Sequence, residues 1–151
     1  MNWAEFAREA ADFAAAGTRL LALHDDIAIG FLATVHRALH LAPVCPVFCG
    51  PGVYLSVGKT TPKRRDLDRD GRYVLHAFLA ANDEEFRIAG RAQLVAEPDE
   101  RARVHQAIRF GAFDRSDPIY RLDIESSMWG YWENAGHPGT YPVRRHWRSK
   151  A

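Results

Sequence analysis

Apolar side chains recur at helical spacing over residues 1–17. Trp3 and Phe13 belong to this apolar stripe, while charged side chains such as Glu5 and Arg8 fall on the opposite side. Such alternation is typical of an amphipathic helix, and we expect the helix to end at Gly17. A stripe of this kind usually covers a sheet or contacts a second subunit, so the helix supplies no predicted site residues.

From residue 27 onward the pattern changes to short apolar runs of strand length. The runs are rich in β-branched and aromatic residues and span residues 27–35, 42–48, 53–57, 73–79 and 86–95. The connections between them are too short for crossover helices, so the strands must be antiparallel and a parallel doubly wound sheet is excluded. Residues 28–33 are apolar on both faces. We therefore predict a mainly β, α+β fold, with a closed barrel that a helix or a partner subunit covers on one side.

The last third of the chain adds a helix and two strands. Asp99 is the expected N-cap of a helix that runs to Gly111. A strand is predicted at residues 119–124, and Trp129, Tyr131 and Trp132 follow it. A loop at residues 134–140 then leads into a basic strand at residues 141–147. A chain of this length without a linker or repeat indicates one domain over residues 1–151.

Charge and cysteine content narrow the function classes. The net charge of +1 offers no global attraction to nucleic acid or to a membrane, and we expect neither as a partner. Cys45 and Cys49 would lie about 13 Å apart in an extended strand, beyond disulfide reach, which indicates buried thiols in a reducing compartment. No apolar run approaches the roughly 20 residues that span a bilayer. We expect a cytoplasmic protein.

The stretch YLSVGKTTPKRRDL at residues 54–67 gathers cations and hydroxyls where a strand meets a helix. Gly58 breaks the strand, Thr60 or Thr61 suits an N-cap, and Pro62 suits the first helical position. The backbone N–H groups of a helix start favour an anion. Four cations surround the same point: Lys59, Lys63, Arg64 and Arg65. The stretch predicts a phosphate site, with a solvated loop that binds nothing as the alternative.

The histidines favour no metal site. His36 and His40 lie four residues apart in a predicted turn, where no further ligand completes a chelate. His76, His105 and His146 fall in three different predicted elements. We predict no metal site and assign no catalytic acid or base.

The order of elements and several short motifs resemble the pyridoxamine 5'-phosphate oxidase-like family of FMN-binding split β-barrels. The family's first strand carries a pattern like Leu-Ala-Thr-Val, found here at residues 32–35, and its second a proline-valine pattern, here at residues 43–47. A Lys-x-x-(Asn or Asp)-Leu helix start follows at residues 63–67, and Gly90 with Ala92 matches a Gly-x-Ala pattern. The similarity covers roughly residues 20–147, and it rests on the order of these weak motifs.

The resemblance implies a six- to seven-stranded antiparallel split β-barrel with flanking helices. Such proteins are homodimers that hold flavin at the subunit interface. The family pattern would place the FMN phosphate against Lys63 and the hydroxyls of Thr60 and Thr61. Lys59 or Arg64 would assist.

The resemblance also implies positions for the rest of the flavin. The ribityl chain and ring would follow Ser56, Val57, Pro46 and Val47. A tryptophan near the C-terminus would approach the flavin from the partner chain, and Trp132 is the expected residue, with Trp129 as the alternate. Either tryptophan is equally compatible with a place in the core.

The implied function is a flavin (FMN)-dependent oxidoreductase of a small-molecule substrate that the sequence does not identify. A reductase that uses the deazaflavin cofactor is one alternative, and a non-catalytic protein that binds flavin or haem is another. The oxidase grips its substrate phosphate with an Arg-Leu-His-Asp-Arg motif, whereas this chain has VRRHWR at residues 143–148, so we do not expect pyridoxamine phosphate oxidation. That basic segment either binds an anionic substrate or protects an exposed edge strand. Glu85 stands where the oxidase has a glutamine near the flavin.

Overall fold

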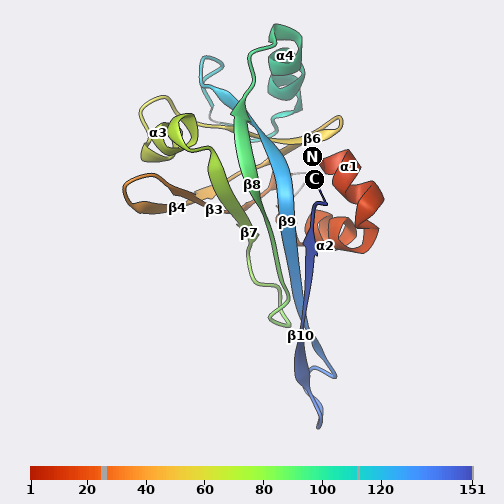
Figure 1. Cartoon of the computed structure of the whole chain (residues 1–151). Coiled ribbons are helices and arrows are strands. Elements are labelled where there is room, and N and C mark those ends of the chain that lie inside the picture. Colours follow the sequence, from red (N-terminus) through yellow and green to blue (C-terminus); the bar gives the residue numbers. More distant parts are fainter. Residues whose placement is uncertain (25–26, 112, 151) are drawn as a thin grey trace.

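The computed structural model describes residues 1–24, 27–111 and 113–150, and its main feature is an eight-stranded antiparallel sheet (Figure 1). The strands are β3 (Gly30–Val35), β4 (Leu39–Val44), β5 (Val47–Cys49), β6 (Gly52–Ser56), β7 (Arg72–Ala77), β8 (Glu85–Leu94), β9 (Ile119–Glu133) and β10 (Tyr141–Arg148). Their order is β4-β3-β7-β8-β9-β6-β5, with β10 also paired to β9. The sheet curls into a half-barrel, which confirms the predicted split-barrel fold class. The expected closed barrel is not formed by the described residues, and the sheet has eight strands where six or seven were expected. Two further short strands, β1 (Ala22–His24) and β2 (Ile27–Ala28), pair with each other.

β9 pairs with three other strands of the sheet. It pairs with β8 from Tyr120 to Gly130, with β6 near its start and with β10 over its second half. The sequence predicted a strand only to residue 124, because Ser126, Ser127 and Gly130 weaken the strand pattern. Pairing with neighbours on both sides outweighs that low local propensity, so the strand continues to Glu133.

The predicted N-terminal helix is two helices, α1 (Trp3–Glu9) and α2 (Ala11–Leu21). The chain bends at Ala10, whose φ of −139° and ψ of 60° leave the helical region. Gly17 does not end the helix as predicted. It lies buried inside α2, where an added Cβ would stand 2.5 Å from the ring of Phe86, so a glycine lets the helix approach the sheet closely.

Helix α4 (Pro98–Ala107) covers a second, smaller core. Val104 and Ile108 pack there against residues of β5, β6 and β9. The predicted N-cap Asp99 is wrong: the N-cap is Glu97, because Pro98 occupies the first helical position with its fixed φ. The helix also ends at Ala107 and not at Gly111.

The predicted strand at residues 42–48 is divided between β4 and β5. Pro46 separates them, since it has no N–H to donate to the ladder. Cys45 and Cys49 are free thiols as expected, but both are half-buried and not fully buried. Burial raises the pKa of the Cys45 thiol.

Beyond Gly130, β9 has only β10 as a neighbour, and the two strands project from the body as an arm (residues 131–143; Figure 1). The predicted loop at residues 134–140 forms its tip. Asn134, Gly136 and Gly139 adopt positive φ there, which asparagine and glycine tolerate. None of the helices in the described part of the chain is long and apolar enough to cross a membrane.

Candidate functional site

The predicted anion loop connects β6 to helix α3 (Pro62–Arg69). Thr61 is the N-cap and Pro62 the first helical residue, as the sequence indicated. The hydroxyl of Thr61 donates a hydrogen bond of 2.9 Å to the carbonyl of Gly58, and no side chain caps the helix. The backbone N–H groups of the first turn therefore have no side-chain partner and face the loop.

Lys59 and Arg64 point to a different side of the loop, toward residues 114–118. The Lys59 ammonium contacts the Ser116 hydroxyl and lies 3.8 Å from the Asp114 carboxylate. The Arg64 guanidinium donates to the Lys59 carbonyl at 3.0 Å. These two cations are therefore engaged away from the helix start.

Lys63 is the cation that stays beside the helix start. It is half-buried, one turn before Asp66 on the inward face of α3, and forms no hydrogen bond or ion pair with any described residue. Thr60 is exposed next to it. The structure thus separates Lys63 and the two threonines from Lys59 and Arg64.

Asp66 anchors α3 to the sheet. Its side chain is 5% exposed and accepts hydrogen bonds from the Thr34 hydroxyl at 2.8 Å and from His40 Nδ1 at 2.7 Å. Burial opposes ionisation, but these hydrogen bonds outweigh it and hold the pKa of Asp66 below its usual value. Sequence reasoning did not identify this anchor, although Asp66 is the acid of the Lys-x-x-(Asn or Asp)-Leu motif at residues 63–67.

The residues predicted to follow the flavin ring are mostly inaccessible. Val57 is fully buried, and Val47 packs beneath α4. Pro46 is also buried, whereas Ser56 is half-buried at the end of β6. Apart from Ser56, these positions expose almost no surface to a ligand in the single chain.

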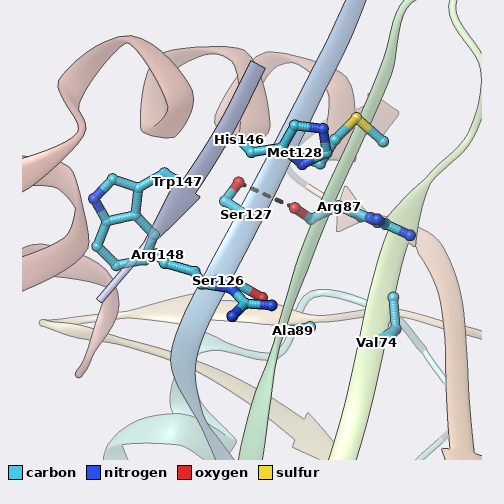
Figure 2. Close-up of a pocket in the computed structure, with 9 residues that line it drawn as sticks. All are labelled: Val74, Arg87, Ala89, Ser126, Ser127, Met128, His146, Trp147 and Arg148. Carbon is cyan, nitrogen blue, oxygen red and sulfur yellow. Dashed lines mark hydrogen bonds between the residues drawn. The ribbon is translucent and has the colours of Figure 1, made fainter. Parts of the chain in front are cut away.

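A second candidate site lies on the outer face of the sheet. Strand pairing sets Val74, Ala89, Ser126 and Arg148 in one row and Arg87, Met128 and His146 in the next. Together they line a groove of about 510 Å³, the outer-face groove (Figure 2).

Three basic side chains surround the outer-face groove. Arg87, His146 and Arg148 are exposed, and none of the groove's lining residues is acidic. Figure 2 shows the Ser127 hydroxyl turned to the Arg87 carbonyl, to which it donates at 3.0 Å. Apolar side chains between the cations form the floor, so the groove suits a flat ligand with an anionic group. The basic run of β10 is visible in the sequence, but its proximity to Arg87 is not, because it depends on the pairing of β8, β9 and β10.

Glu85 lies at one end of this face. It accepts from Arg144 Nε at 3.2 Å, and its second oxygen lies 3.9 Å from His76 Nε2. Gly130 stands between Glu85 and Arg144 in the sheet, and an added Cβ there would lie 2.7 Å from the Glu85 side chain. The glycine therefore makes room for the ion pair.

The two candidate tryptophans have different environments. The indole N–H of Trp129 donates to Glu84 at 2.8 Å, and Phe13 and Arg145 cover its ring. Trp132 lies on the arm, is 40% exposed and contacts none of the aromatic rings of the described residues. Trp132 is thus the tryptophan that a partner chain or ligand can reach.

The curled antiparallel sheet, the flanking helices and the order of elements are those of a split β-barrel, the fold of the pyridoxamine 5'-phosphate oxidase-like proteins. No family model matches the sequence, and a search of curated proteins finds no match. Solved structures do match. A candidate pyridoxamine 5'-phosphate oxidase from Listeria innocua has a TM-score of 0.57 at 18% identity, over 73% of this chain and 91% of that one.

Two further matches are similar in quality. The haem-binding protein from Mycobacterium smegmatis gives a TM-score of 0.57 at 18% identity, over 85% of this chain and 57% of that chain. PhzG from Burkholderia lata, in complex with tetrahydrophenazine-1-carboxylic acid, gives a TM-score of 0.53 at 13% identity, over 93% of this chain and 90% of that chain. Identities this low establish the shared fold, and the chain spans little more than half of the haem-binding protein.

Proposed function

We propose that the protein is an FMN-dependent oxidoreductase of a small-molecule substrate. The observation that carries the proposal is the start of α3, where first-turn N–H groups without a side-chain cap meet the unpaired, half-buried Lys63. Helix dipole and ammonium both favour a phosphate at this point. Asp66 fixes the helix to the sheet, so the site is preformed.

The bound flavin would supply hydride or electron transfer, and the chain would position it. Lys63, the Thr60 hydroxyl and the first-turn N–H groups would hold the phosphate, while Thr61 donates to the Gly58 carbonyl and shapes the loop. The outer-face groove would receive the substrate, and its three basic side chains favour one with a carboxylate or phosphate.

We further propose that two copies form the working unit, with flavin at their interface. Split barrels of this fold are typically dimeric. On this chain Leu39 and Leu41 are 73% and 66% exposed beside the outer-face groove, and an isolated two-stranded arm is marginally stable in water. A second copy would cover both and bring its Trp132 to the flavin.

Replacing Lys63 with Ala tests the phosphate site. Loss of one charge-assisted hydrogen bond should weaken FMN binding by about 1.5 to 3 kcal/mol and leave riboflavin, which has no phosphate, nearly unchanged. Fluorescence titration with both ligands measures this. Arg65→Ala is the matched control, because Arg65 is an exposed cation on the same helix. Equal weakening of FMN and riboflavin would place Lys63 outside the phosphate site.

Haem binding is the second candidate function. The outer-face groove sets the exposed imidazole of His146 beside Met128, with Arg87 and Arg148 at its edges. Imidazole and thioether ligate haem iron, and guanidinium groups pair with propionates. A haem spectrum that disappears in His146→Ala would support this candidate. The deazaflavin cofactor stays an alternative to FMN at the α3 site, and a titration with each cofactor separates them.

A further inference from the structure

A second cationic hollow lies on the other side of the anion loop, between α3 and α4. It has a volume of about 280 Å³ and is lined by Lys59, Arg64, Arg101 and Ser116 around Leu94 and Pro118. We propose that this α3–α4 cleft binds a small molecule with a phosphate or carboxylate group, separately from the flavin phosphate at Lys63.

The three cations come from three segments that fold together. Lys59 belongs to the loop, Arg64 to the first turns of α3 and Arg101 to the first turns of α4. Arg101 has no ion-pair partner among the residues that the structure describes. The Nε atom of Arg64 is buried without a hydrogen-bond partner in the described chain, although an Asp68 oxygen lies 3.3 Å away. The guanidinium of Arg101 thus remains available for an anion, whereas the buried Nε atom of Arg64 faces Asp68.

The acids near the cleft are already engaged with other groups. Asp68 accepts a hydrogen bond from the Tyr120 hydroxyl. Asp114 accepts from both the backbone N–H and the hydroxyl of Ser116, and these bonds hold its pKa below the usual value. The Asp114 side chain is 63% exposed and only loosely paired with Lys59. An anion can therefore compete for Lys59 in place of this exposed carboxylate.

Apolar groups complete the cleft and indicate the ligand's other part. Leu94, at the end of β8, is 58% exposed, and Pro118 and the buried Val95 line the cleft with it. A phosphate or carboxylate between the cations would place an attached apolar group against Leu94. Phenyl phosphate has this combination.

NMR titration of the full-length protein with phenyl phosphate and inorganic phosphate tests the proposal, at constant ionic strength in chloride. Arg101→Gln should weaken phenyl phosphate by about tenfold or more, the effect of one lost charged hydrogen bond. Arg101→Lys should retain most of the affinity. Arg109 is an exposed arginine just beyond the end of α4. Arg109→Gln is therefore the control, and it should change the affinity for phenyl phosphate less than twofold.

Two outcomes would overturn the proposal. One is equal weakening by Arg101→Gln and Arg109→Gln, which would indicate general charge attraction. The other is loss of phosphate binding in Lys63→Ala with no effect of Arg101→Gln, which would assign the anion to the flavin site. Neither probe contains flavin. The result of the phenyl phosphate titration is therefore independent of whether the protein binds FMN.

Discussion

Asp66 offers a stability test of the contact that positions the candidate site. In Asp66→Ala the Thr34 hydroxyl, on a residue only 2% exposed, would lose its acceptor, and the charged hydrogen bond to His40 would also be lost. A buried hydroxyl without a hydrogen-bond partner costs about 1 to 3 kcal/mol, and loss of the half-exposed His40 contact costs less. We therefore expect the free energy of unfolding to fall by about 2 to 4 kcal/mol. For a chain of this size that lowers Tm by roughly 5 to 15 °C.

Thermal and urea unfolding followed by circular dichroism measure the Asp66 effect. Thr34→Val combined with Asp66→Ala removes the hydroxyl that Asp66→Ala leaves without an acceptor, so the double variant should be more stable than Asp66→Ala alone. A double variant that is equally or less stable would refute the reasoning. Asp70→Ala, which removes the half-buried partner of the exposed Arg72 side chain, is the control and should have a smaller effect.

The same contact predicts a pH dependence. The pKa of Asp66 is lower in the folded protein than its ordinary value of 3.8, so its stabilisation is complete above that value and is lost as the pH falls through the folded pKa. The stabilities of the wild type and Asp66→Asn should therefore start to converge as the pH falls below 3.8 and become similar below the folded pKa of Asp66. A difference that is unchanged at lower pH would contradict the assigned ionisation.

Four further predictions concern the sheet and the dimer. In Gly90→Ala the new Cβ would overlap the backbone carbonyl of Asp123 at the β8–β9 bulge, so we expect a loss of about 3 kcal/mol or failure to fold, measured by soluble yield and unfolding. Gly130→Ala would displace the Glu85 side chain, which can move, so a loss of about 1 kcal/mol is expected, and a loss as large as that of Gly90→Ala would contradict it. Sedimentation should give about twice the chain mass of 17.0 kDa, and Trp132→Ala should weaken FMN binding while Tm changes little. A stable monomer that binds FMN fully would argue against an interfacial flavin.

Local patterns sufficed for most of the sheet and for the start of α3. Short apolar runs rich in β-branched and aromatic residues located the strands, and the threonines before Pro62 limited the N-cap to Thr60 or Thr61, of which the structure has Thr61. The bend at Ala10 could not be predicted, because alanine is the strongest helix former and the break arises where α1 and α2 pack on different parts of the sheet. The continuation of β9 through Gly130 likewise depends on its neighbours.

The candidate sites depend on long-range register that one sequence does not contain. The basic loop was evident, but the sequence could not show that Lys59 turns to Ser116, which lies 57 positions further along the chain. The outer-face groove requires Arg87 to meet His146 through their common neighbour Met128 on β9. Both arrangements follow from strand pairing and not from local spacing.

Direct titration of the purified protein with FMN tests the central claim. We expect saturable binding of one FMN per chain with quenched flavin fluorescence, and release of FMN, identified by its mass, from protein purified with its ligand. A colourless protein that binds neither FMN nor the deazaflavin cofactor would contradict it.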